Sequence, residues 1–123
     1  MSRTILVVDD QEDNRRILRD LLTASGFEVV EAQTGEDAVT LAEAQTPALI
    51  LMDIQLPGID GYEATRRIKA IAALRATPLI VVTSYALSGD DVKAFAAGAD
   101  AYVSKPFSPR ALLAKVREFL GPP

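Results

Sequence analysis

The sequence predicts an α/β fold: a doubly wound, five-stranded parallel sheet with helices on both faces. Two observations predict it. Short runs of Val, Ile, Leu and Met, each of the length of a buried strand, alternate with longer stretches whose apolar residues recur at helical spacing. Glycine, proline and helix-capping residues separate these segments, so the connecting loops are short. Such an alternation favours parallel strands joined by right-handed crossovers.

The first unit joins a strand over Thr4–Val8 to a helix over Glu12–Ala24. The strand is almost entirely apolar, as expected where both faces of a sheet are covered. The helix carries one apolar stripe, which we expect to face the core, and Gly26 suits its C-terminal end. The residues of the stripe are Ile17, Leu18, Leu21 and Leu22.

The second unit begins with Phe27–Glu31, where apolar and polar residues alternate as in a strand near the edge of a sheet. Thr34 can cap the helix that follows, which we expect to end near Ala44. Pro47 separates this helix from the third strand, Ala48–Met52, which is again a continuous apolar run.

The third helix is predicted to begin after Asp60, whose side chain can cap it with Glu63 as the capping-box partner. We expect this helix to end within residues 72–74. Pro78 then opens the fourth strand, Leu79–Val82, which is apolar throughout.

The last two helices are predicted from their caps. Ser88 with Asp91 resembles a cap for the fourth helix, and a short fifth strand follows over Asp100–Val103. Ser108-Pro109 supplies an N-cap and a first-turn proline for a final helix that reaches about Leu120.

Composition narrows the possible functions. The chain has 123 residues, 49% of them hydrophobic, which suits one domain over 1–123, and no output domain is expected after the final Gly-Pro-Pro. A net charge of −4 argues against binding nucleic acid or an anionic membrane. No signal peptide or membrane-spanning run is visible, so a cytoplasmic location is expected. The absence of Cys and His excludes thiol chemistry, histidine metal sites and a Ser–His–Asp triad.

Five polar residues follow the apolar strands: Asp9, Asp10, Asp53, Thr83 and Lys105. The carboxyl ends of parallel strands meet at one edge of the sheet, where open α/β folds bind their ligands. Three carboxylates and one ammonium group leave a charge of about −2, which a bound Mg²⁺ (or Mn²⁺) would neutralise. Taken singly, each Asp is as readily explained as a turn former or a helix cap. Taken together, they favour a metal site.

Asp53 has a second possible role, because a carboxylate can accept a phosphoryl group when cations neutralise its oxygens. Lys105 can supply one such cation and Thr83 a hydroxyl donor, although alone they suit a surface lysine and a strand residue. The Lys105-Pro106 bond is a candidate for the cis form. Tyr102 can rotate between buried and exposed positions, or serve as a plain half-buried strand residue.

The motifs resemble those of a known family, the receiver domains of two-component response regulators. The resemblance extends over essentially the whole chain, and the absence of an output domain resembles the single-domain regulators of chemotaxis and cell division. It implies a flavodoxin-like sheet with strand order 2-1-3-4-5. The motifs are Val7-Val8-Asp9-Asp10, the segment Met52-Asp53-Ile54-Gln55-Leu56-Pro57-Gly58-Ile59-Asp60-Gly61, Val82-Thr83-Ser84 and Ser104-Lys105-Pro106-Phe107.

The resemblance also implies a role for each site residue. Asp53 would accept a phosphoryl group from a histidine kinase or a histidine phosphotransfer protein. Asp10, Asp53 and the main-chain carbonyl of Gln55 would hold Mg²⁺, with Asp9 assisting through water. Gln55 and Tyr85 occupy positions that, in this family, influence the access of hydrolytic water.

On phosphorylation, the resemblance implies that Thr83 moves towards the phosphoryl group, which Lys105 also binds, and that Tyr102 turns inward. This would remodel the face made by the fourth helix, the fifth strand and the fifth helix, where a downstream protein docks. The same face can serve for self-association, so a monomer or a weak dimer is expected. The protein would catalyse its own phosphorylation and dephosphorylation, but as a signalling switch rather than an enzyme.

The first helix offers a docking face for the phosphodonor, with Asn14, Arg15 and Arg19 expected near the pocket rim or in solvent. Alternatively, Arg15, Arg16 and Arg19 form only a solvated helix face.

Three other functions compete with a phosphorylated switch. A hydrolase of the haloacid-dehalogenase type also forms an aspartyl phosphate, but it favours an Asp-x-Asp arrangement and a cap insertion, whereas this chain has adjacent Asp9-Asp10. A receiver-like scaffold that is never phosphorylated need not keep every charged residue. Flavin binding is disfavoured because the acidic loop after the first strand would repel the flavin phosphate.

Overall fold

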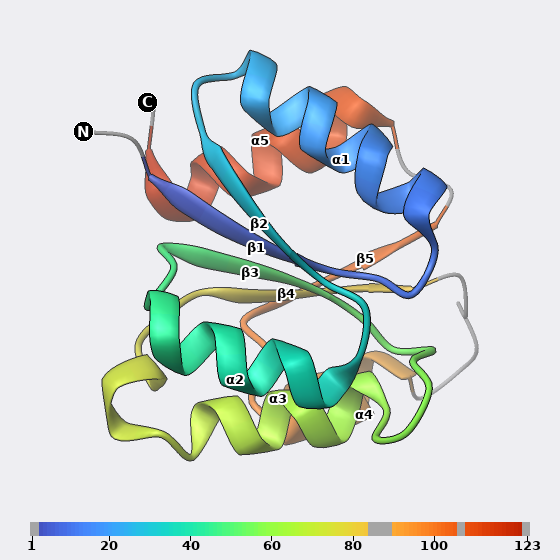
Figure 1. Ribbon diagram of the computed structural model, residues 1–123, viewed down its shortest axis with the longest axis vertical. Helices are drawn as coiled ribbons and strands as arrows, with labels where there is room; N and C mark the ends of the chain where they lie inside the picture. Colours follow the sequence, from blue (N-terminus) through green and yellow to red (C-terminus); the bar gives the residue numbers. More distant parts are fainter. Residues whose placement is uncertain (1–2, 84–89, 106–107, 122–123) are drawn as a thin grey trace.

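The computed structural model describes residues 3–83, 90–105 and 108–121, which form a sheet with helices on both faces (Figure 1). All neighbouring strands are parallel, in the order β2-β1-β3-β4-β5, which confirms the predicted fold and strand order. The elements are β1 (Thr4–Val8), α1 (Glu12–Ala24), β2 (Glu28–Ala32), α2 (Gly35–Gln45), β3 (Leu49–Asp53), α3 (Gly61–Lys69), the 3₁₀ turn η1 (Ala72–Leu74), β4 (Leu79–Thr83), α4 (Asp90–Ala97), β5 (Ala101–Ser104) and α5 (Pro109–Leu120).

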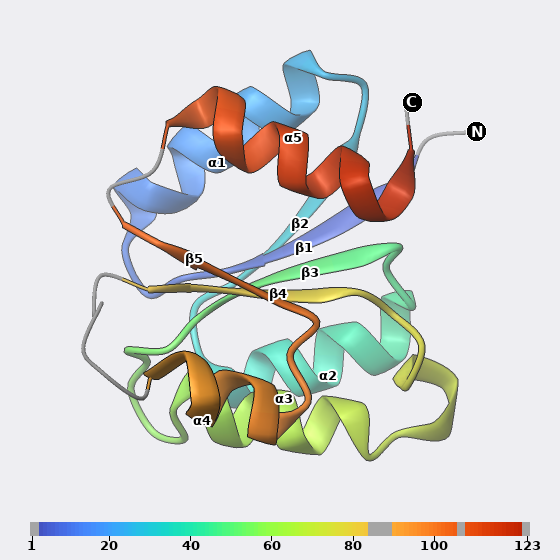
Figure 2. The ribbon, with the colours of Figure 1, turned by 180° about the vertical axis from the view of Figure 1, so that it is seen from behind.

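The helices divide between the two faces of the sheet: α1 and α5 cover one face, and α2, α3 and α4 cover the other (Figures 1 and 2). Alternate residues of each strand point to opposite faces, so Ile5 and Val7 pack with α1 and α5, while Leu6 and Val8 pack on the other side. Each fully buried Leu, Ile or Val side chain contributes roughly 1.5–3 kcal/mol. These two cores pack against opposite faces of the sheet.

The inward face of α1 differs from the predicted stripe. Leu18 and Leu22 are buried as expected, but Ile17 is 55% exposed and Leu21 is only half-buried. Arg15 takes the place expected of an apolar residue and is buried. The three buried positions are spaced by three and four residues, whereas Ile17 lies about 100° round the helix from its neighbour Leu18.

Three of the predicted helix caps are present. Thr34 accepts a hydrogen bond from the Asp37 amide at 3.0 Å, and Asp60 accepts one from the Glu63 amide at 2.9 Å. Ser108 caps α5 in the same way.

Several element boundaries differ from prediction, and those of β3, β4 and β5 differ by a single residue. The third helix ends at Lys69, and the turn η1 occupies the segment that was expected to close it. Phe27 precedes β2 and is part of the core. The predicted cap of Ser88 with Asp91 lies outside the described residues. Within the described ranges, no helix combines the length and the apolar character needed to cross a membrane.

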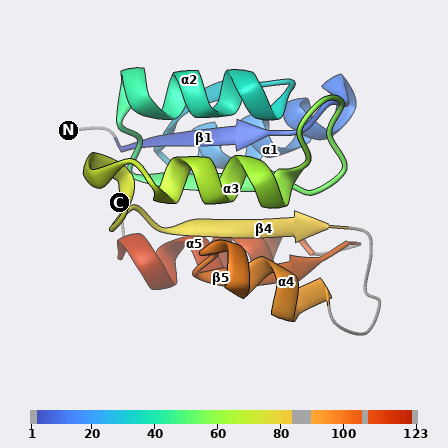
Figure 3. The same ribbon diagram turned by 90° about the horizontal axis from the view of Figure 1, so that it is seen from below.

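The strand register brings Asp9 and Asp53 to the same edge of the sheet. Val8 lies opposite Met52, so Asp9 and Asp53 follow at the same level on adjacent central strands. The arrows of β1 and β4 point the same way (Figure 3), so the carboxyl ends of these two strands lie at the same edge of the sheet. Gly61 anchors the loop after β3, because its amide donates to the Ile54 carbonyl at 2.9 Å. A Cβ atom there would lie 2.1 Å from the Asp53 carbonyl oxygen.

Candidate functional site

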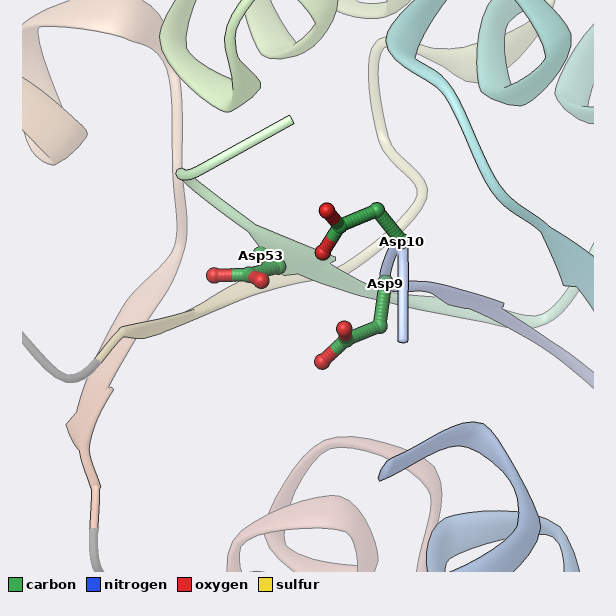
Figure 4. Close-up of side chains that lie close together, drawn as sticks. All are labelled: Asp9, Asp10 and Asp53. Carbon is green, nitrogen blue, oxygen red and sulfur yellow. The ribbon is translucent and has the colours of Figure 1, made fainter. Parts of the chain in front are cut away.

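Three carboxylates gather at this edge. Asp9, Asp10 and Asp53 each offer an oxygen, and these oxygens lie within 4.8 Å of one another (Figure 4). Asp9 and Asp53 are buried, with 2% and 8% of their surface exposed, whereas Asp10 is exposed. The predicted acidic cluster is therefore formed, and Asp10 is its solvent-facing member.

The carboxylate of Asp9 is held by protein groups. Its Oδ1 atom accepts a hydrogen bond from the Gln11 amide at 2.9 Å and a longer one from Asn14 Nδ2 at 3.5 Å. Its Oδ2 atom lies 3.2 Å from the Lys105 ammonium. With both oxygens occupied in this way, Asp9 is suited to orient the site rather than to give up an oxygen freely.

The carboxyl group of Asp53 has a raised pKa. Burial raises the pKa of its carboxyl group to about 6; the Lys105 ammonium acts against this rise and the Asp9 carboxylate adds to it. Its Oδ2 atom is 3.8 Å from Lys105 Nζ, and its Oδ1 atom accepts from the Gln55 amide at 3.4 Å. Near neutral pH the carboxylate is mostly ionised at a cost, so a cation beside it would be favourable.

A cleft of about 440 Å³ opens over these groups. Among the described residues, those that line it are all polar: Asp10, Gln11, Asn14, Asp53, Gln55 and Lys105. Asn14 lies at the cleft as expected, whereas Gln11 lines the cleft although the sequence motifs assign it no role. Its place directly after the Asp pair, at the start of α1, is the signal that points to it.

Thr83 and Lys105 are linked through the main chain. The Thr83 carbonyl accepts a hydrogen bond from the Lys105 amide at 2.6 Å, so the ends of β4 and β5 are tied together beside the cleft. Thr83 is fully buried. Tyr102 is half-buried and packs against the core on the side of α2, α3 and α4. The Lys105-Pro106 bond and Tyr85 lie outside the described residues.

Arg15 is not where we expected it. In place of a position at the rim or in solvent, it is 4% exposed and donates to the main-chain carbonyl of Asp9 at 2.7 Å. Its guanidinium also pairs with Glu12 and Glu31. The spacing of Arg15 from Leu18 and Leu22 places it on the buried face, which is a pattern that the apolar residues alone do not reveal.

The donor set suits Mg²⁺. Each of the three side chains offers a carboxylate oxygen, and the side-chain amides of Gln11, Asn14 and Gln55 line the cleft beside them. Mg²⁺ prefers oxygen ligands of this kind together with water. Two of the three carboxylates are buried, so a dication would also relieve their mutual repulsion.

Comparison with known proteins gives a consistent result. A family model described as the response regulator receiver domain matches residues 5–117. The polar-differentiation response regulator DivK of Brucella ovis is 40% identical over 121 residues, which cover 98% of both chains.

Two solved structures share the fold. The receiver domain of sensor histidine kinase PA1611 from Pseudomonas aeruginosa PAO1, with a magnesium ion coordinated in its active site cleft, is 36% identical with a TM-score of 0.91, and the match covers 98% of this chain and 99% of that one. A CheY-like response regulator receiver domain protein from Methanospirillum hungatei JF-1 is 34% identical with a TM-score of 0.90, and the match covers 96% and 93%.

Proposed function

The chain belongs to the receiver domains of response regulators, and from that premise we propose that it is a signalling switch controlled by phosphorylation of Asp53. Receiver domains of this family act as switches, and the relatives of this chain are response regulators of the DivK and CheY types. The observation that carries the proposal is the placement of Asp53 in the polar cleft, beside two further carboxylates and the Lys105 ammonium.

Phosphoryl transfer to Asp53 would proceed by attack of a carboxylate oxygen on phosphorus. An oxygen–phosphorus bond forms while the bond from phosphorus to the donor's imidazole nitrogen breaks. The released imidazole keeps the electron pair of the broken bond and, with one proton on its ring nitrogens, is neutral. A histidine donor would lie outside these 123 residues, because they contain no His. Lys105 would bind one phosphoryl oxygen, and the Thr83 hydroxyl another once it moves towards the site.

Asp10 and Asp53 would hold Mg²⁺ together with the main-chain carbonyl of Gln55, with Asp9 assisting through water. The exposure of Asp10 and the hydrogen bonds that occupy Asp9 support this division of roles. Bound Mg²⁺ would supply positive charge against the phosphoryl oxygens. The magnesium ion in the cleft of the PA1611 receiver domain supports the choice of metal, and Mn²⁺ prefers the same kind of ligand.

The partners we propose are a histidine kinase or phosphotransfer protein as donor and a downstream protein as target. Helix α1 presents Asn14 at the cleft and an exposed Ile17, which favours it as the donor's docking face. Helix α4 exposes Val92 and Phe95, which favours the face of α4, β5 and α5 for the target. Movement of Thr83 and rotation of Tyr102 would couple phosphorylation of Asp53 to the shape of this target face.

A histidine kinase uses intracellular ATP, so we propose a cytoplasmic location.

A small-molecule phosphodonor with intact-mass measurement tests the proposal. Wild-type protein should gain the mass of one phosphoryl group with Mg²⁺ and none when EDTA replaces it. Asp53→Asn should gain none, whereas Asp13→Asn, which alters an exposed carboxylate, should label as wild type does. Labelling of Asp53→Asn to the wild-type extent would overturn the assignment. Release of phosphate over many turnovers from a phosphomonoester would favour a hydrolase instead.

A further inference from the structure

Arg15 forms a buried hub behind the acidic loop. Its Nη1 atom donates to the Asp9 carbonyl at 2.7 Å, and its Nε atom donates to Glu31 Oε1 at 3.2 Å. Its Nη2 atom pairs with Glu12. Three directions of the guanidinium are therefore used at once, by a main-chain oxygen and by carboxylates from α1 and β2.

The hub is itself anchored to the edge of the sheet. Glu31 lies on β2 opposite Val7 of β1, and its second oxygen accepts from Arg19 at 2.9 Å. The Asp9 amide donates to the Ala32 carbonyl of the same strand at 3.1 Å. Asp9 is thus held through its amide by the backbone of β2 and through its carbonyl by Arg15, which β2 in turn positions.

The carbonyl of Asp9 belongs to the peptide unit that joins it to Asp10. A peptide unit is planar, so a hydrogen bond that fixes this oxygen also fixes the orientation of the Asp10 amide in the same plane. The position of the Asp10 side chain depends on that orientation. Mg²⁺ accepts only near-octahedral ligand geometry, so small rotations of this peptide would matter.

We propose that Arg15 is a positioning residue for the metal site, because it holds the Asp9–Asp10 peptide in the orientation that Mg²⁺ binding requires. The inference rests on the proposed Mg²⁺ site. It assigns to a buried arginine on α1, rather than to a residue of the cleft, part of the site's affinity for the metal.

The charge of Arg15 and its hydrogen bond to Asp9 predict opposite effects of a substitution on Mg²⁺ affinity. Removing a positive charge near three carboxylates would by Coulomb's law strengthen the binding of a dication. Removing the hydrogen bond to the Asp9 carbonyl would weaken it. Arg15→Met removes both the charge and the hydrogen bond. Arg15→Lys keeps the charge but loses the planar guanidinium, whose three nitrogens contact Asp9, Glu12 and Glu31 at once.

The test is calorimetric titration of the metal-free protein with Mg²⁺. Arg15→Met and Arg15→Lys should each weaken Mg²⁺ binding by about 10- to 100-fold, the usual effect of altering groups that orient metal ligands. Glu31→Gln keeps the side-chain volume but loses the charge that anchors Arg15, so it should weaken binding in the same direction. Arg16→Met changes an arginine that is 58% exposed and should bind Mg²⁺ as wild type does.

A second readout needs no metal. The Gln11 amide, which donates to Asp9 Oδ1, should exchange with solvent deuterium faster in the Arg15 variants than in wild type. Circular dichroism melting curves identify any variant that does not fold, in which case Glu31→Gln carries the test.

Binding of Mg²⁺ by the folded Arg15 variants that is as tight as wild type, or tighter, would overturn this inference alone. Absence of Mg²⁺ binding by the wild-type protein would overturn the proposed metal site, and the inference with it.

Discussion

Lys105 and Asp9 lie 96 residues apart in the sequence, yet their Nζ and Oδ2 atoms are only 3.2 Å apart. The same ammonium is 3.8 Å from Asp53, so it pairs more closely with the residue that orients the site than with the proposed acceptor. A phosphoryl group on Asp53 would therefore compete with Asp9 for Lys105. If Asp53 is phosphorylated as proposed, Lys105 would have two alternative partners, Asp9 before phosphorylation and the phosphoryl group after it, as a switch requires.

Replacement of Lys105 by Met should raise the pKa of Asp53 above its value of about 6, because the ammonium acts against the rise caused by burial. The measurement is a pH titration of the Asp53 carboxyl carbon by NMR in metal-free buffer. Lys115→Met is the control, since Lys115 lies on α5 and pairs with Glu118. An unchanged or lower Asp53 pKa in Lys105→Met would contradict this electrostatic account.

Stability should depend on pH through Asp53. The folded protein raises the pKa of this group from 3.8 to about 6, so it binds the proton more tightly than the unfolded chain does. The stabilisation from protonated Asp53 is complete below about pH 4 and is lost as the pH rises through 6. Asp53→Asn cannot ionise, and in metal-free buffer it should be more stable than wild type at pH 8 by up to about 3 kcal/mol.

Urea unfolding at pH 4, 6 and 8 in EDTA measures this effect. The difference between Asp53→Asn and wild type should shrink towards zero at pH 4, while Asp13→Asn should show no such pH-dependent gain. A stability difference of the same size at all three pH values would show that the charge of Asp53 is not its cause.

Mg²⁺ should stabilise the folded protein by binding it in preference to the unfolded chain. At 100 times its dissociation constant, the free energy of unfolding should rise by about 2.7 kcal/mol. Asp10→Asn removes an exposed carboxylate of the cluster and should lose most of this gain at the same Mg²⁺ concentration. Thermal melting with and without Mg²⁺ measures it. A full Mg²⁺-dependent gain in Asp10→Asn would remove Asp10 from the site.

Gly61 should tolerate no side chain. A Cβ atom would lie 2.1 Å from the Asp53 carbonyl oxygen and 2.7 Å from Ile54 Cα, both in the backbone at the end of β3. Gly61→Ala should cost about 3 kcal/mol in urea unfolding, because the backbone must shift. Gly121→Ala is the control: its φ of 75° costs about 1 kcal/mol, and nothing lies within 4 Å of its Cβ. Equal losses would mean that the close approach is unimportant.

The sheet and its acidic edge could be predicted because the carboxyl ends of parallel strands all lie at the same edge of a sheet. Once Asp9 and Asp53 are recognised as the residues that follow buried strands, the register that pairs Val8 with Met52 brings them to one level. The caps at Thr34 and Asp60 were predictable for a similar reason, since each depends on residues three positions apart.

The face of α1 could not be predicted from its apolar residues. Neighbouring residues differ by about 100° around a helix, so choosing Ile17 instead of Arg15 turns the expected inward face towards solvent. Arginine is buried only when its charge is paired, and the pairing with Glu31 comes from a different strand. The closer pairing of Lys105 with Asp9 likewise depends on tertiary positions of side chains, which no local pattern encodes.

The most direct test of the central claim is to locate the phosphoryl group. Borohydride reduces an acyl phosphate to an alcohol, so a phosphorylated aspartate is converted to homoserine, which peptide sequencing by mass spectrometry identifies. After treatment with a phosphodonor and Mg²⁺, homoserine should be found at position 53 and at none of the other aspartates. Homoserine at position 9 or 10, or its absence from position 53 in protein that carries a phosphoryl group, would contradict the account.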